Sequence, residues 1–330
     1  MTESPATTVP VVNTTTCDTT VVDTARIVVI QIRMGLAIPS VIGNCLSFAV
    51  MTMKKNRCLT SCFLMANLAI VDTIPLLAFL HDYLSTARLH DTNTRPFYCQ
   101  LGVFLGNLGV TSAAWIVFLM TAERCVAILM PLKVSQICTM RNARISVLVV
   151  YVVVSIRHIH SFFFFTTTFD ADSGWYSCVF VEGYDNVMVA DRIFKLAFDS
   201  LGPCVLIFIA NILIIMSLRK RQQANLGATS SGATDKRTYS QQQITRTLLF
   251  VSITFSVLVT PHTVRTFLQA VNPAPPASCN STSYNKDSII DKVLHGLLYV
   301  NHGINFFLYC IGGGKRFRND VAAVLKCKRN

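Results

Sequence analysis

The chain has 330 residues, of which 52% are hydrophobic and only 14% are charged, whereas soluble domains carry about 25% charged residues. Its mean hydropathy of +0.48 leaves too few polar residues for a water-exposed surface, and the composition excludes a disordered, collagen-like or disulfide-framework protein. The formal net charge is nonetheless +12. Such an excess is typical of nucleic-acid-binding proteins, of proteins on an anionic membrane surface, or of membrane proteins with their cations on one side.

Seven stretches are long and apolar enough to cross a membrane as helices, which takes about 20 mostly apolar residues each. They lack the alternation of barrel strands and exceed the length of such strands. Pro203 and Pro261 fall inside the fifth and sixth stretches, where a membrane helix tolerates a proline kink. The spans are 34–53, 59–80, 101–130, 145–165, 193–218, 244–268 and 289–311. We therefore predict an all-α membrane protein with a seven-transmembrane helix bundle.

The two ends of the chain are expected to flank this bundle. An extracellular N-terminal tail takes 1–26, the bundle takes 27–312, and a cytoplasmic segment takes 313–330. In the last segment Phe317, Val321 and Val324 recur at helical spacing among basic residues, a pattern typical of a short amphipathic helix on the inner leaflet. Cys327 is a palmitoylation candidate, and a plain reduced cysteine is the alternative.

The basic residues lie mainly on one side of the spans. Of the 29 Lys and Arg residues, 19 lie at or beyond the ends of spans one, three, five and seven, with three acids, so the local net charge is +16. The opposite side has 10 cations and 13 acids, a net charge of −3, and Asp72 lies inside span two. Because cations gather on the cytoplasmic side, we expect a plasma-membrane protein with its N-terminus outside and its C-terminus in the cytoplasm. This sidedness accounts for the basic excess and excludes nucleic-acid binding.

Two further features agree with this orientation. Asn13 and Asn280 each begin a glycosylation sequon, and both are expected outside. The outer side also holds four cysteines, which allow three pairings in an oxidising compartment: Cys17, Cys99, Cys178 and Cys279. The other eight of the 12 cysteines are expected to be free thiols.

Short motifs occur in a fixed order along the spans. They are Gly43-Asn44 in span one, the run NLAIVD ending at Asp72 in span two, Glu123-Arg124-Cys125 followed by Pro131-Leu132, Pro203 in span five, Phe255 and Pro261 in span six, and Asn305-Phe306-Phe307-Leu308-Tyr309 in span seven. In this order and spacing they resemble the rhodopsin-like G-protein-coupled receptors over nearly the whole chain. Phe306 stands where the last motif usually has a proline.

The resemblance implies how the chain would signal to a heterotrimeric G protein, with arrestin as a further partner. Glu123 and Arg124 would form an acid–base pair that holds the inactive state, and a plain helix-end salt bridge is the alternative. Gln243 and its neighbours stand where an acid would reach Arg124 from span six, so we expect no ionic lock between these helices. The implied coupling and switch residues are Glu123, Arg124, Pro131, Pro203, Phe255, Pro261, Asn305 and Tyr309.

The switch region also departs from the family pattern. Val259 in span six and Tyr151 in span four stand where the family has tryptophan, and Asn211 in span five stands where it has tyrosine. These losses leave two options, signalling with altered switch parts or weak coupling. We favour the first because Arg124 and Tyr309 are both present.

The resemblance further implies a disulfide between Cys99 and Cys178, which would tie span three to the second outer loop. Cys17 and Cys279 are then left, either paired or as two free thiols. A pair would staple the N-terminal tail to the third outer loop.

Asp72 is a carboxylate in mid-membrane, which is costly unless it is protonated, paired or ion-bound. Asn44, Asn301 and Asn305 are expected to converge on it. The resemblance implies a sodium site at Asp72, Asn301 and Asn305. A hydrated Asp–Asn network without tight sodium is the alternative, since Ala113 stands where a serine ligand is usual.

The upper parts of the spans are polar and of mixed charge, which suits a peptide better than a lipid. Gly106 stands where aminergic receptors carry an aspartate and Tyr299 where opsins carry a lysine, so both ligand classes are disfavoured. For any single candidate, a rim residue facing water is the alternative. The candidate ligand-binding residues are Asp82, Asn107, Arg157, Arg192, His262, Arg265, Asp291, His295 and Tyr299.

We therefore predict a cell-surface receptor that binds an extracellular ligand and activates a heterotrimeric G protein. Resemblance to invertebrate FMRFamide and thyrotropin-releasing-hormone-like receptors implies a neuropeptide ligand. No cofactor and no enzymatic activity are expected. The alternatives are a chemosensory or non-signalling receptor of the same fold, or a transporter, which would show inverted repeats and broken helices.

Overall fold

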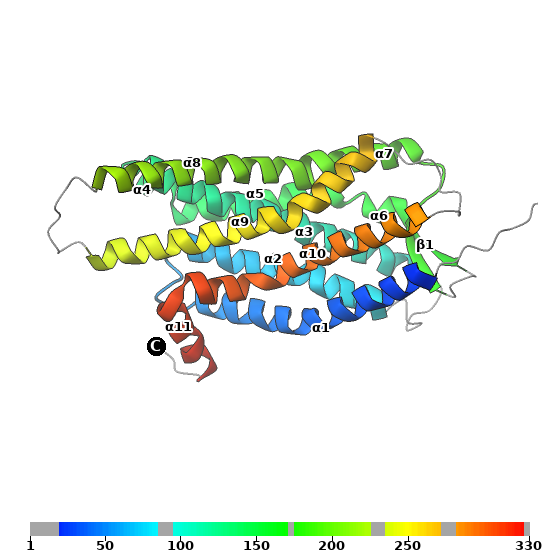
Figure 1. Cartoon of the computed structure of the whole chain (residues 1–330), viewed down its shortest axis with the longest axis horizontal. Coiled ribbons are helices and arrows are strands. Elements are labelled where there is room, and N and C mark those ends of the chain that lie inside the picture. The colour runs from blue at the N-terminus through cyan, green and yellow to red at the C-terminus, as the bar shows by residue number, and fades with distance from the viewer. Residues whose placement is uncertain (1–19, 85–94, 171–174, 226–234, 272–281, 327–330) are drawn as a thin grey trace, which may run out of the picture.

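The computed structural model describes residues 20–84, 95–170, 175–225, 235–271 and 282–326 (Figure 1). Asn13, Cys17, Cys279, Asn280 and Cys327 therefore lie outside the described residues, and the predictions made for them stay predictions.

Long helices running side by side make up nearly all of the molecule (Figure 1). Each of the seven predicted spans overlaps one of these long helices, which confirms the predicted helix bundle. The long helices are α1 (Thr20–Met51), α2 (Thr60–Leu84), α3 (Arg95–Leu129), α5 (Met140–His158), α8 (Gly202–Asn225), α9 (Asp235–Val271) and α10 (Thr282–Gly312).

Six helical stretches among the described residues are long and apolar enough to cross a membrane. They are Met34–Met51, Thr60–Ala78, Pro96–Leu129, Met140–Phe164, Asn186–Lys220 and Thr245–Gln269. The seventh long helix, α10, carries Asn301, His302 and Asn305 along its apolar part, which lowers its mean hydropathy. It still packs against α1 and α9 within the bundle (Figure 1).

The fourth and fifth spans differ from the predicted ranges. The fourth apolar span runs from Met140 to Phe164, close to the predicted end at residue 165, but it is interrupted after α5 ends at His158, and a short helix α6 (Ser161–Phe164) completes it. The fifth span begins early, as α7 (Asp185–Phe194), and continues through a π-helical turn, η2 (Lys195–Leu201), into α8. Pro203 has no N–H to donate and lies just after this turn, where a widened hydrogen-bond register is favoured.

An antiparallel hairpin that the sequence analysis did not predict follows α6. It consists of β1 (Phe165–Asp170) and β2 (Trp175–Phe180), whose aromatic and threonine side chains favour extended backbone. Cys178 on β2 forms a disulfide with Cys99 in the first turns of α3. The expected Cys99–Cys178 bond is therefore confirmed, and it holds the hairpin against the bundle.

Close helix contacts occur where α3 and α2 meet. A Cβ atom added to Gly109 would collide with the Pro75 ring and lie 2.9 Å from the Val71 carbonyl oxygen. Small residues permit such close approach in membrane bundles. On the outer faces of α5 and α8, by contrast, Leu148 and Phe208 are 62% and 61% exposed, as expected for side chains that face lipid.

The short helix α11 (Gly314–Leu325) turns away from the bundle axis after α10 (Figure 1). Gly314 has a φ of +60°, a conformation that glycine adopts at little cost. Phe317 is buried against the bundle, while Leu325 is exposed. We call this end of the bundle the α11 end and the opposite end the hairpin end; we expect the α11 end to face the cytoplasm.

Candidate functional site

The α11 end contains the acid–base pair expected from the sequence. Arg124 Nη2 lies 2.7 Å from Glu123 Oε1, and the two side chains are only 7% and 10% exposed. Thr60 and Ser61 at the start of α2 donate hydrogen bonds of 2.6 and 2.8 Å to the same carboxylate oxygen. Arg124 also donates to the Ser61 hydroxyl. The pair is therefore held within α2 and α3, and it can open only if several hydrogen bonds are exchanged.

The contact between α9 and α10 at this end is a neutral hydrogen bond. Gln243 Nε2 donates to the Gly313 carbonyl oxygen at 2.5 Å. Just beyond it, a Cβ atom added to Gly312 would lie 2.8 Å from Thr247 Oγ1. The described acids include none that pairs with Arg124 from α9. As expected, no ionic lock to Arg124 from α9 is found among the described residues. Gln243 instead joins α9 to the end of α10 through its amide, a contact that the sequence analysis did not predict.

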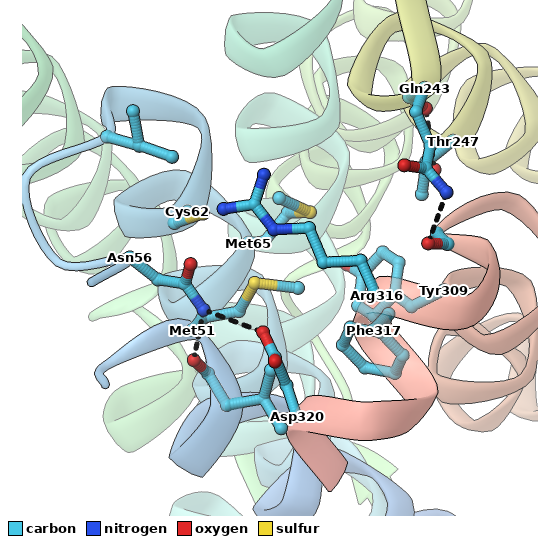
Figure 2. Close-up of a pocket in the computed structure, with 13 residues that line it drawn as sticks. Met51, Asn56, Cys62, Met65, Gln243, Thr247, Tyr309, Arg316, Phe317 and Asp320 are labelled. Atoms are coloured by element: carbon cyan, nitrogen blue, oxygen red, sulfur yellow. Dashed lines mark hydrogen bonds between the residues drawn. The ribbon is translucent and has the colours of Figure 1, made fainter. Parts of the chain in front are cut away.

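A cavity lies between α1, α2, α9, α10 and α11 at the same end (Figure 2). Tyr309 forms part of its wall, is 1% exposed, and has no hydrogen bond from its hydroxyl among the described residues. Its ring lies 5.8 Å from that of Phe317. The Arg316 side chain reaches from α11 across the cavity toward α2 (Figure 2). Because the cavity adjoins the Tyr309 ring, the tyrosine side chain has room to move.

The position of α11 depends on Asp320, which the sequence analysis did not single out. Its carboxylate is 7% exposed and lies 2.5 Å from Lys55 Nζ. Asn56 Nδ2 donates to the same carboxylate at 3.5 Å and to the Val50 carbonyl oxygen at 2.9 Å (Figure 2). An acidic residue among the basic residues of an amphipathic helix was the signal that could have identified this anchor.

In mid-bundle, Asp72 is completely buried and has a partner that the sequence analysis did not assign to it. His302 Nδ1 lies 2.8 Å from Asp72 Oδ1, and Asn305 Nδ2 donates to Oδ2 at 2.7 Å. Asn44 reaches this centre indirectly, by donating to the His302 carbonyl oxygen at 3.1 Å. Asn301 is buried, but among the described residues no hydrogen bond joins it to Asp72.

These residues do not fit a sodium ion. An alkali cation needs several oxygen ligands in place of its water shell, but both Asp72 oxygens face nitrogen atoms, the His302 ring nitrogen and the Asn305 amide nitrogen. Asn305 uses its amide nitrogen, and Ala113 has no hydroxyl to offer. Asn44 Oδ1, Ser47 Oγ and Ser112 Oγ are buried without a hydrogen bond among the described residues, but the carboxylate that would be the charged ligand already faces two nitrogen atoms.

Two of the positions that depart from the expected motif pattern, Tyr151 and Asn211, take part in hydrogen bonds between helices. Tyr151 of α5 donates to Asn67 Oδ1 of α2 at 3.1 Å. Ser252 of α9 donates to Asn211 Oδ1 of α8 at 2.8 Å. Phe255 and Val259 are both buried in α9. The substituted positions are therefore built into specific contacts between helices.

At the hairpin end, the outer parts of α9 and α10 bring four predicted ligand residues together. Arg265 Nε lies 2.9 Å from Asp291 Oδ1, and Gln269 donates to the other carboxylate oxygen at 3.0 Å. The rings of His262 and His295 lie 4.8 Å apart, one turn further into the bundle. These pairs join α9 to α10 on the side where a ligand is expected to enter.

A second charged group lies where α5, α7 and η2 meet. Arg157 lies 2.9 Å from Asp191 and 3.9 Å from Asp199. His158 is fully buried, 3.1 Å from the Thr111 hydroxyl of α3 and 3.5 Å from Asp199. Arg157 Nε and Asp199 Oδ1 have no hydrogen bond among the described residues. Of this group, only Arg157 was among the predicted ligand residues. Asp191 was missed because it precedes the predicted fifth span, whereas the helix begins at Asp185.

The other predicted ligand residues differ in their exposure. Asn107 and Tyr299 are half-buried on α3 and α10, and Arg192 on α7 is exposed. Asp82 falls in α2, but its side chain lies outside the part of the structure that can be described. Pro131 is exposed in the connection after α3, next to Leu132, whose side chain is 91% exposed.

Comparison with known proteins agrees with these features. Residues 43–309 match the sequence profile of a family described as 7 transmembrane receptor (rhodopsin family). The chain is 23% identical over 252 residues to a Mizuhopecten yessoensis protein named "Rhodopsin, GQ-coupled", over 71% of this chain and 48% of that protein. It is 22% identical over 314 residues to a Caenorhabditis elegans protein named as a G-protein coupled receptor, over 85% of this chain and 70% of that protein. The chain thus spans about half the length of the first relative.

Proposed function

We propose a signalling function on the premise that the chain belongs to the rhodopsin family of seven-transmembrane receptors, whose profile covers residues 43–309. The protein is a plasma-membrane receptor that binds an extracellular peptide at the hairpin end and activates a heterotrimeric G protein at the α11 end. Its N-terminus lies outside the cell. Arrestin is a further partner at the same cytoplasmic surface.

The observation that carries the coupling proposal is the buried Glu123–Arg124 pair. A guanidinium that is 7% exposed at a helix end has lost most of its water and needs its partner carboxylate. If the helices separate at the α11 end, Arg124 can bind water or a protein partner in place of Glu123. The exposed Leu132 nearby supports a docking surface, because Leu129 and Met130 beside it are also exposed and contiguous exposed apolar side chains mark sites for a protein partner.

A peptide ligand is supported by the chemistry of the hairpin end. Both charge signs occur there, in the Arg265–Asp291 pair and in the group around Arg157. A peptide with an amide or a charged terminus can exchange into such pairs through charge-assisted hydrogen bonds. The relative named as a rhodopsin does not change this proposal, because Tyr299 stands where the resemblance places the lysine of a retinal-binding protein.

A peptide acts as an agonist only to the extent that it binds the active state better than the inactive state. The test is to express the receptor in cells with G-protein activation sensors and to screen a library of amidated neuropeptides. An active peptide should then fail on Arg124→Ala at equal surface expression, while Arg141→Ala, a change at an exposed arginine of α5, keeps the response. A full response from Arg124→Ala would contradict the coupling mechanism.

A further inference from the structure

The environment of Asp72 differs from an ion site in the kind of atom that faces the carboxylate. Asp72 Oδ1 faces His302 Nδ1 at 2.8 Å, and Oδ2 accepts from Asn305 Nδ2 at 2.7 Å. When Asp72 is ionised it only accepts hydrogen bonds, and a neutral ring with its proton on Nδ1 then donates to it; when Asp72 carries the proton, the ring nitrogen accepts. In either case a ring nitrogen and an amide nitrogen of one helix lie at hydrogen-bond distance from the two carboxylate oxygens.

Close packing of α1 against α10 fixes the position of the imidazole. A Cβ atom added to Gly303 would collide with Ser40, and one added to Gly43 would lie 2.9 Å from Phe306 Cβ. Between these two contacts, Asn44 donates to the His302 carbonyl oxygen. α10 therefore packs closely against α1 next to His302, which lies at hydrogen-bond distance from Asp72.

We propose that the His302 imidazole is a built-in replacement for a bound sodium ion: it joins α10 to α2 through Asp72 and keeps sodium out of the centre of the bundle. The joined arrangement is then a fixed property of the chain and does not depend on the sodium concentration outside the cell. His302 is 4% exposed at its side chain and Asp72 is 0% exposed. A hydrogen bond shielded from water in this way is strong, and an unpaired carboxylate there would be costly.

The test measures thermal unfolding of the purified receptor, so it requires neither a ligand nor a G protein. A thiol-reactive dye reports unfolding because Cys62 and Cys204 are free and buried. Unfolding is compared in NaCl, KCl and choline chloride at about 0.15 M. The wild type should unfold at the same midpoint in all three salts. A midpoint that rises in sodium alone, and that Asp72→Asn abolishes, would overturn the proposal.

Two variants test the role of His302 directly. His302→Ser combined with Ala113→Ser exchanges a nitrogen donor and a methyl group for two hydroxyl ligands, and it should gain a sodium-specific rise of about 3 °C through binding linkage. Adding Asp72→Asn should remove that rise. His302→Ser alone serves if the double variant is not recovered folded. A folded variant without any sodium response would show that His302 is not what keeps the ion out.

The proposed signalling function enters only in a last arm. In cells, replacing external sodium by choline should leave agonist-independent signalling of the wild type unchanged and should raise that of the His302→Ser, Ala113→Ser variant. This arm rests on coupling to a G protein. If the unfolding results agree with the proposal and no signalling is found, the receptor function has failed and the inference about Asp72 stands.

Discussion

Removing the Gln243 side-chain amide should raise agonist-independent signalling. Gln243 Nε2 donates to the Gly313 carbonyl oxygen at 2.5 Å and connects α9 to the junction of α10 and α11. Outward movement of α9 at this end would break that bond. Gln243→Ala removes the donor, and Gln243→Met also removes it but keeps most of the volume and introduces no acid that could reach Arg124. Both variants should therefore shift the receptor toward its active state.

The size of the shift follows from the energy of one hydrogen bond. A neutral hydrogen bond contributes about 1 kcal/mol net, and a factor of 10 in an equilibrium corresponds to about 1.4 kcal/mol. Losing the bond therefore changes the ratio of the two states about fivefold. From a resting active population of about 1%, the variants should reach about 5%, a fivefold rise in basal G-protein activation.

The measurement is ligand-free G-protein activation divided by the number of receptors at the cell surface. Gln136→Ala is the matched control, because Gln136 is an exposed glutamine of the short helix α4 (Val134–Ile137) in a connection that does not reach α10. If Gln243→Ala and Gln243→Met leave basal signalling at the wild-type value, the hydrogen bond does not hold the inactive state. A rise in Gln243→Ala alone would point to lost packing in its place.

Three further outcomes are expected. Asp320→Ala removes the carboxylate that holds α11 at Lys55, just after the end of α1. The unfolding midpoint of the purified receptor should fall by about 3 °C, because a partly buried charged hydrogen bond is lost. An unchanged midpoint would contradict this anchor. Leu132→Ala should reduce maximal G-protein activation while agonist affinity without G protein stays at the wild-type value; an unchanged maximum would exclude Leu132 from the docking surface. In a double-mutant cycle, Arg265→Ala and Asp291→Ala should couple by only about 0.5 kcal/mol in stability, because both side chains are partly exposed; a coupling above about 2 kcal/mol would show that the pair is far more enclosed.

The sequence predicted the helical framework because each span carries a long apolar signal that the bilayer requires. It also placed Glu123 and Arg124 as neighbours and Asn305 near Asp72, since short motifs with fixed spacing lie on these helices. The Cys99–Cys178 bond followed from the resemblance and is confirmed.

Other features depended on how helices rotate and where they end, which apolar runs do not specify. His302 precedes Asn305 by three positions, so both lie on one face of α10, and this spacing was a signal that could have identified His302. Asn301 precedes Asn305 by four positions and therefore also lies beside it on the helix surface, but among the described residues it is His302 and Asn305 that reach Asp72. Asp191, the partner nearest to Arg157, lay outside the predicted fifth span, because the helix begins at Asp185, before its apolar run, and the π-helical turn that follows shifts the faces of the helix.

The two polar contacts of α5 decide how this helix is rotated in the membrane. Tyr151 bonds to Asn67 of α2, and His158 lies 3.1 Å from Thr111 of α3. The two residues are seven positions apart, about two helical turns, and therefore lie along one line of the helix surface. In lipid an apolar face gains little by turning inward, so a helix that is apolar all round has no preferred rotation. On α5 these two contacts favour one rotation of the helix about its axis. Tyr151 thus orients α5 in addition to packing against α2.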